Sequence, residues 1–151
     1  MPENIIVDTS CLVVLHKIGE LDLLKKLYEN ILITESVAKE FGFSLPNWIT
    51  VTKSEKEDKE FLRKYNLDSG ELSVIALAKD KGGLLILDDL KARVAAADLN
   101  LDYTGTLGTL VEAKLSGHLS SLKRVLDQIK LTNFYLSEEL EDKLLQMVGE
   151  N

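Results

Sequence analysis

Acidic side chains directly follow two apolar segments that are predicted to be β-strands. Asp8 comes after Ile5–Val7, and Asp88 and Asp89 come after Leu84–Leu87. Both segments are short, continuous apolar runs, which are typical of strands buried on both faces of a parallel sheet. The carboxyl ends of parallel strands meet at one edge of the sheet, where open α/β folds bind their ligands. We therefore expect these three carboxylates to lie close together at that edge.

Two glutamates can join this acidic group. Glu71 begins a helix that is apolar on nearly every side, and Glu40 lies near the end of a helix that follows the strand Ile31–Ile33. By its residue type alone Glu40 can equally be a plain surface residue of that helix, and it is the family resemblance described below that singles it out. Three or four carboxylates that meet at one point cannot all stay ionised unless a cation neutralises them. Oxygen ligands without a plausible His/Cys set favour Mg²⁺ or Mn²⁺ over zinc. Such ions lower the pKa of bound water and stabilise charge on a phosphate under attack, so the pattern indicates phosphodiester or phosphate chemistry.

The aspartates also have a structural explanation, because Asp is a common residue at the start of a helix. Asp8 can cap the helix that follows it, although Thr9 and Ser10 are good N-caps as well. Either Asp88 or Asp89 can cap the next helix, which leaves the other one without a structural role. The sequence does not decide which of the two faces a metal.

Other polar residues near these carboxylates have two interpretations each. Glu71 has the strongest structural one, because Asp68-Ser69-Gly70-Glu71 forms a capping box with Glu71 at N3. Lys91 and Arg93 follow the acidic corner and can hold a phosphate beside the metal, or be ordinary solvated charges. Thr106 can be an N-cap, or its hydroxyl can orient a metal-bound water.

The composition is that of a globular protein, and we expect residues 1–151 to form one domain. No apolar run approaches the roughly 20 residues of a membrane span, and the N-terminus has no signal-peptide pattern. The single cysteine, Cys11, cannot form an internal disulfide, so we expect a cytoplasmic protein without membrane association. The net charge of −7 argues against general adhesion to nucleic acid, but local RNA binding through cations or a basic patch is compatible with it.

Strand-like and helix-like segments alternate along the chain, which predicts a three-layer α/β domain with a mostly parallel central sheet. The segment from Ser54 to Tyr65 carries the densest run of charges and is expected to be a mostly solvated helix. Two later helices are expected to present apolar faces, formed in the first by Leu90, Val94 and Ala97 and in the last by Leu140, Leu144, Met147 and Val148.

The motifs of this chain, taken together, resemble the PIN-domain family. They follow one another at suitable spacing over nearly the whole chain: Val7-Asp8-Thr9-Ser10, Val37-x-x-Glu40, Ser69-Gly70-Glu71, Leu87-Asp88-Asp89, Arg93, and Gly105-Thr106-Leu107-Gly108. The resemblance implies a three-layer α/β/α PIN-like fold and an Mg²⁺- or Mn²⁺-dependent endoribonuclease with an acidic pocket. It also implies a relationship to VapC-type ribonuclease toxins, whose partners are an RNA substrate and a cognate antitoxin.

Carried over position by position, the resemblance gives roles to individual residues. Asp8, Glu40, Glu71, and Asp88 or Asp89 would be the metal-binding carboxylates, and Asp8, Glu71, Asp88 and Asp89 the catalytic set. Thr9, Lys91, Arg93 and Thr106 are assigned to substrate binding. Two positions depart from many such toxins, which have Asp where Glu71 stands and Thr where Leu87 stands, two residues before Asp89.

Two other classes of function use a similar arrangement. A PIN-fold chain without catalytic activity would be a binding or regulatory module. A metal-dependent phosphatase or phosphorelay receiver also places Asp residues at strand ends, but a receiver needs a Lys after a late strand, and none closely follows the strand Asp102–Thr104. The apolar faces of the terminal helices also permit a homodimer.

Overall fold

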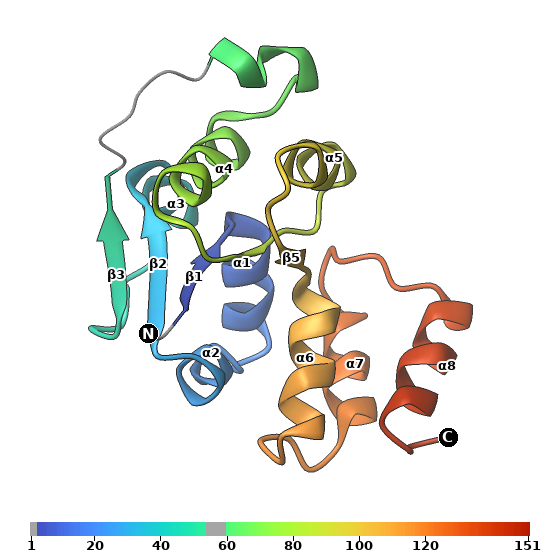
Figure 1. Ribbon diagram of the computed structural model, residues 1–151. Helices are drawn as coiled ribbons and strands as arrows, with labels where there is room; N and C mark the ends of the chain where they lie inside the picture. The colour runs from blue at the N-terminus through green and yellow to red at the C-terminus, as the bar shows by residue number, and fades with distance from the viewer. Residues whose placement is uncertain (1–2, 54–59) are drawn as a thin grey trace.

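The computed structural model describes residues 3–53 and 60–151, and this part of the chain contains a five-stranded sheet flanked by helices (Figure 1). The strands are β1 (Asn4–Val7), β2 (Asn30–Thr34), β3 (Ile49–Thr52), β4 (Leu84–Ile86) and β5 (Tyr103–Thr104). They lie in the order β3-β2-β1-β4-β5, and every neighbouring pair is parallel. The predicted three-layer α/β/α fold with a parallel central sheet is therefore confirmed.

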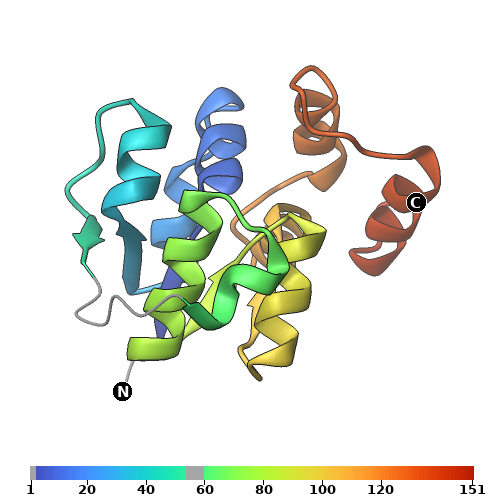
Figure 2. The same cartoon turned by 90° about the horizontal axis from the view of Figure 1, so that it is seen from above.

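Helices connect these strands and continue beyond the last one. They are α1 (Thr9–Lys17), α2 (Asp22–Leu27), α3 (Glu35–Phe41), the 3₁₀-helix η1 (Glu60–Tyr65), α4 (Ser69–Lys81), α5 (Leu90–Asp98), α6 (Thr106–Leu115), α7 (Leu122–Ile129) and α8 (Glu138–Met147). Figure 2 shows α1 and α3 on one side of the strands and α4 and α5 on the other. None of the helices in the described ranges has the length and hydropathy that crossing a membrane requires.

Strand β1 is central because its side chains suit burial on both faces. Ile5, Ile6 and Val7 are all buried, as expected for a strand with a helical layer on each side. The register pairs Ile5 with Ile31 of β2, and Val7 with Ile86 of β4. This register places the residues that follow β1 next to those that follow β4.

The charged segment from Ser54 to Tyr65 was expected to be a mostly solvated helix. Residues 54–59 lie outside the described part of the chain, and Glu60–Tyr65 forms the 3₁₀-helix η1. Arg63 and Lys64 of η1 are exposed as expected, whereas Leu62 is fully buried. The hydroxyl of Tyr65 also donates to Asp98 Oδ2 of α5 (2.7 Å). These two contacts hold η1 against the body of the protein.

Helix α5 buries a different face from the one predicted. Leu90 and Val94 are 75% and 47% exposed, whereas Ala92, Ala95 and Ala96 are fully buried. Helix α5 contacts α4 and η1. The prediction was wrong because it ranked Leu and Val above Ala by hydrophobicity, whereas small side chains are what allow neighbouring helices to approach closely.

Helix α8 buries only part of its predicted apolar face. Leu144 is buried as expected, but Leu140 and Met147 are 39% and 62% exposed. The buried face includes Glu141, which is 6% exposed and forms an ion pair with Lys130 at the end of α7. Helix α8 is therefore held to α7 partly by charge.

Candidate active site

The candidate site lies at the C-terminal edge of β1 and β4, where the connectivity of the sheet changes direction. The chain runs outward from β1 through β2 to β3 and then returns to β4, on the other side of β1. The backbone N–H of Asp8 donates to the carbonyl of Ile86 (3.0 Å), so the segments that follow the two strands stay adjacent. In open α/β sheets such a switch point is the usual ligand-binding crevice.

A cleft of about 540 Å³ opens at this edge, and six acidic side chains line it. They are the five carboxylates predicted from the sequence together with one residue that was interpreted only as a helix cap: Asp8, Glu40, Asp68, Glu71, Asp88 and Asp89. No lysine or arginine is among the described residues that line the cleft. The structure thus places all of the predicted acidic residues around one pocket.

Asp8 is the most buried of the six carboxylates that line the cleft. It is 5% exposed, and it is itself the N-cap of α1, with Oδ1 accepting from Thr9 N (2.8 Å). The residues after Asp8 were also good cap candidates, but the structure gives the cap to Asp8. The pKa of Asp8 is raised from 3.8 to about 6, mainly by burial and in smaller part by the negative charges of Asp68, Glu40 and Asp88, against the opposing effect of the Thr9 N–H.

Asp88 and Asp89, which the sequence could not distinguish, have different environments. Asp88 Oδ1 accepts from Thr106 N (2.8 Å), and Asp88 Oδ2 accepts from the hydroxyls of Thr106 (2.6 Å) and Ser10 (2.9 Å). Asp89 is exposed and caps α5, with Oδ2 accepting from Ala92 N (3.1 Å). Asp88 is therefore fixed between β4, α1 and α6, whereas Asp89 is positioned by its own helix.

The residues assigned to substrate binding are placed differently from one another. Thr9 lines the cleft, and its buried Oγ1 has no hydrogen-bond partner in the described part of the chain. Thr106 is fully buried, and its hydroxyl is directed to Asp88, so its described role is to position that carboxylate. Gly105, not Thr106, is the N-cap of α6. Lys91 is exposed on α5 outside the described lining of the cleft.

Arg93 stabilises the segment after β4 that carries Asp88. Its Nε donates to the carbonyl of Leu87 (2.9 Å), and its guanidinium lies over the ring of Tyr103, with Cζ 5.3 Å from the ring centroid. Gly105 makes room for this arrangement, because a Cβ there would lie 2.8 Å from Asp88 Oδ1 and would also collide with the guanidinium. Contact between Arg93 and a substrate phosphate stays a prediction.

Glu71 and Asp68 form the capping box that the sequence predicts. Asp68 Oδ1 accepts from Glu71 N (2.8 Å), and Glu71 Oε1 accepts from Asp68 N (3.0 Å). The pKa of Glu71 is raised from 4.5 to about 7, mainly by burial and in smaller part by the negative charges of Asp68, Asp89 and Asp8, although the N–H of Asp68 opposes this rise. Glu71 thus serves the helix through one oxygen and still faces other carboxylates across the cleft.

Gly70 marks the place where α3, α4 and α1 approach one another. A Cβ at Gly70 would lie 3.1 Å from Glu40 Oε1 and 3.6 Å from Thr9 Oγ1. The N-termini of α3 and α4 are joined by their hydroxyls, with Thr34 Oγ1 and Ser73 Oγ 2.7 Å apart. The Ser73 hydroxyl donates to the carbonyl of Gly70 (2.7 Å), so the proton between the two hydroxyls comes from Thr34. These hydrogen bonds hold the start of α3, the helix that carries Glu40, against α4.

The donor set of the cleft fits a hard divalent cation. Burial and mutual repulsion raise the pKa of Asp8 and Glu71, and the described lining offers no basic side chain to compensate the negative charge. Carboxylate and hydroxyl oxygens without His or Cys in that lining match Mg²⁺ or Mn²⁺. Among the described residues, no three acidic, His or Cys side chains already converge as ligands around one point.

Some residues that line the cleft carried no functional prediction from the sequence. Ser10, interpreted only as a cap, donates to Asp88, and its place directly after Asp8-Thr9 was the signal that could have found it. Asn133 and Phe134 reach the cleft from the segment after α7. Phe134 N donates to Thr132 Oγ1 (3.1 Å), which fixes this segment locally. No motif near these two residues marks them, so only the fold could reveal them.

Comparison with known proteins agrees with this architecture. A DUF3368 family model, described as a PIN domain, matches residues 4–150. Because the match covers nearly the whole chain, the protein belongs to the PIN-domain family. PIN domains are generally nucleases, and they usually use divalent metal ions. No curated protein and no solved structure matches the chain significantly.

Proposed function

We propose that this protein is an Mg²⁺- or Mn²⁺-dependent endoribonuclease that hydrolyses RNA phosphodiester bonds in the acidic cleft. The observation that carries the proposal is the gathering of six carboxylates around one pocket at the switch point of a PIN-family sheet. Two of these carboxylates, Asp8 and Glu71, have pKa values raised to about 6 and about 7. Raised pKa values among clustered acids are typical of functional sites.

In this proposal Asp8, Glu71 and Asp88 are the principal metal ligands, and Glu40 and Asp89 complete the acidic wall. A bound divalent ion lowers the pKa of its water and stabilises the charge that develops on a phosphate. The chain itself orients the ligands, because Asp88 is held by three hydrogen bonds and Asp8 by its cap to α1. Glu71 Oε1 is engaged by its capping box, which leaves Oε2 to face the ion or its water.

The orphaned hydroxyl of Thr9 is the second feature that supports a ligand in the cleft. A buried hydroxyl without a partner costs free energy, so a water, an ion-bound water or a substrate oxygen would satisfy it. Its position beside Asp8 is the reason for assigning Thr9 to substrate binding.

The test is cleavage of a labelled single-stranded RNA by purified protein in chelator, Mg²⁺, Mn²⁺ or Ca²⁺. We expect cleavage with Mg²⁺ and Mn²⁺, poor cleavage with Ca²⁺ because it is larger and less strict in geometry, and none in chelator. Asp8→Asn should abolish activity, and Asp142→Asn, an exposed carboxylate of α8, should not change it. Undiminished cleavage in chelator, or full activity of Asp8→Asn, would exclude this mechanism.

A catalytically inactive binding or regulatory module is the alternative, and it predicts RNA or protein binding without cleavage under all of these conditions. We further propose a VapC-type toxin role, with a cognate antitoxin as partner, on the resemblance of the motifs. Expression of the wild type, but not of Asp8→Asn, should then arrest growth of a bacterial host. The cytoplasmic location and the homodimer are likewise proposals, the second tested by light scattering of the purified protein.

A further inference from the structure

A second pocket continues the acidic cleft along helix α1. On the α1 side, the cleft is lined by Ser10, Val13 and Val14, and the second pocket by Lys17 and Ile18. These positions follow the i, i+3, i+4, i+7, i+8 spacing of a single helix face. The same face of α1 therefore forms the wall of both pockets.

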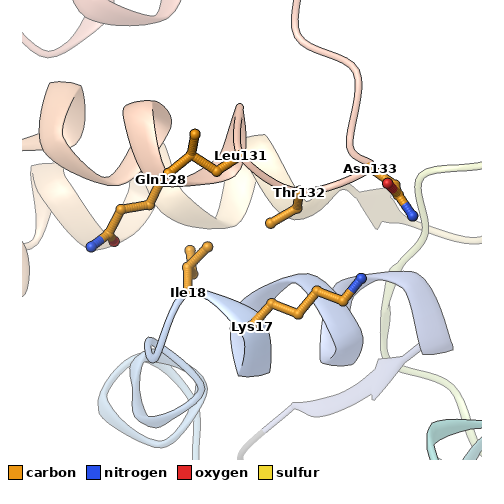
Figure 3. A pocket seen from close by; sticks show the side chains of 6 residues that line it. All are labelled: Lys17, Ile18, Gln128, Leu131, Thr132 and Asn133. Atoms are coloured by element: carbon orange, nitrogen blue, oxygen red, sulfur yellow. The ribbon is translucent and has the colours of Figure 1, made fainter.

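The opposite wall is also shared. The second pocket, of about 510 Å³, is lined there by Gln128 and Leu131 and by Thr132 and Asn133, from the end of α7 and the segment after it (Figure 3). Asn133 lines the acidic cleft as well. The two pockets thus form one groove between α1 and the end of α7, with Asn133 at their junction.

The second pocket supplies the positive charge that the acidic cleft lacks. Lys17 has no ion-pair or hydrogen-bond partner among the residues that the structure describes, and Figure 3 shows its side chain extended toward the Asn133 end of the pocket. The described lining of the acidic cleft holds six carboxylates and no Lys or Arg. A polyanion that enters the cleft therefore finds a basic side chain next along this groove.

One amide at the Lys17 end of the pocket is free to bind a ligand. The side chain of Asn133 is exposed and has no hydrogen-bond partner in the described part of the chain. Gln128 Oε1 is buried without a donor there, and its amide lies at the opposite end of the pocket (Figure 3). Amide side chains donate and accept at once, which suits base edges, ribose hydroxyls and phosphate oxygens.

We propose that this second pocket is a subsite for single-stranded RNA, in which Lys17 binds a backbone phosphate and the Asn133 amide binds the adjoining nucleotide. The inference rests on the proposed nuclease function and adds to it the path of the strand. From Ser10 to Lys17 the helix rises about 10 Å, at 1.5 Å per residue. A strand stacked at roughly 3.4 Å per nucleotide covers this length in about three nucleotides. A dinucleotide stacked in the cleft covers only about two-thirds of this length, so we expect it to gain less from Lys17 than a longer strand does.

The experiment compares a fluorescent hexanucleotide RNA with a dinucleotide, using anisotropy in Ca²⁺ for binding and Mn²⁺ kinetics for cleavage. Lys17→Gln should weaken hexanucleotide binding about fourfold at about 0.15 M salt, because each phosphate contact on a single strand contributes a log–log salt slope of about −0.7. The slope itself should become shallower by about 0.7, and KM should rise with little change in kcat. Dinucleotide binding should change less.

Lys81→Gln is the matched control. It removes the same charge from an exposed lysine at the end of α4, on the other side of the sheet from α1 (Figure 2). Asn133→Ala should resemble Lys17→Gln in raising KM for the hexanucleotide, but it should leave the salt slope unchanged because it removes no charge.

The outcomes separate the subsite from the nuclease function. Lys17-dependent binding of the hexanucleotide without cleavage in Mn²⁺ supports the subsite and contradicts the nuclease. If Lys17→Gln and Lys81→Gln cleave the hexanucleotide with the same KM and the same salt slope, the nuclease function is supported and the RNA subsite is overturned. A peptide is then the next occupant of the groove to be tested. Hexanucleotide binding no tighter than dinucleotide binding also overturns the subsite.

Discussion

Replacing Asp8 with Asn removes a buried negative charge that the fold destabilises, while keeping the shape of the side chain. Asp8 is buried, and its pKa rises from 3.8 to about 6 because of that burial and of the neighbouring carboxylates. Asn is as good an N-cap as Asp, so the hydrogen bond from Thr9 N to the side chain should persist. The substitution therefore isolates the electrostatic cost of the acidic cluster.

The sign and size of the effect follow from linkage. A raised pKa means that the folded state holds the proton of Asp8 more tightly than the unfolded state does. The corresponding stability is fully present below about pH 4 and is lost as the pH rises through about 6. A rise from 3.8 to about 6 corresponds to about 3 kcal/mol, at 1.36 kcal/mol for each pH unit. Asp8→Asn should recover most of this at neutral pH.

The assay is thermal or urea unfolding in chelator at about pH 7.5 and pH 4. At the higher pH, Asp8→Asn should be more stable than the wild type by about 2–3 kcal/mol, or roughly 5–10 °C in Tm for a chain of this size. At the lower pH the two proteins should differ little. Asp89→Asn, an exposed cap, should stay within about 0.5 kcal/mol at both values. A lower Tm for Asp8→Asn at neutral pH would refute the reasoning, because it would make Asp8 a stabilising structural charge.

Three further substitutions test other parts of the site and the fold. Glu71→Gln keeps the capping box but should reduce Mn²⁺ affinity at least tenfold by calorimetry; unchanged affinity would remove Glu71 from the site. Thr106→Val removes the hydroxyl that holds Asp88 and should cost about 1 kcal/mol together with much of the activity, whereas Thr106→Ser should retain both. Glu150 Oε2 accepts a hydrogen bond from Leu122 N (2.6 Å) at the start of α7. Desolvation acts to raise the pKa of Glu150, but the pKa is lowered overall, and this hydrogen bond contributes to the lowering. Glu150→Gln should therefore cost about 0.5–1 kcal/mol at neutral pH, and this difference should shrink as the pH falls below about 4.5; equal urea midpoints at neutral pH would contradict the role.

Local sequence predicted the parts of the site that depend on strand ends. Ile5–Val7 and Leu84–Leu87 are continuous apolar runs, and each is followed at once by acid, so strand, edge and carboxylate could be placed together. The capping box of Glu71 also follows from residue types at fixed spacing, and the structure confirms it. These features need only a few consecutive residues to be recognised.

What could not be predicted depends on contacts between distant segments. Asp88 differs from Asp89 because Thr106 and Ser10 donate to it, and neither contact is visible in the order of residues around position 88. Helix α5 turns its alanines inward because of the helices beside it, which its own hydrophobic pattern does not encode. Asn133 reaches the cleft only through the path of the chain after α7.

Metal binding in the acidic cleft should depend on pH near neutrality. This dependence distinguishes a specific ion site from the general attraction of an acidic protein for cations. Protons compete with a metal for Asp8 and Glu71, whose pKa values are about 6 and about 7. Mn²⁺ at a hundredfold excess over its Kd should stabilise the fold by about 2.7 kcal/mol. We expect most of this stabilisation at about pH 7.5 and little at about pH 5.5, measured as the shift of Tm on adding Mn²⁺. In Asp8→Asn the Tm shift on adding Mn²⁺ at the higher pH should be largely lost, although without metal this variant is more stable than the wild type. Equal shifts at both pH values, or in both proteins, would place the bound ions elsewhere on the surface.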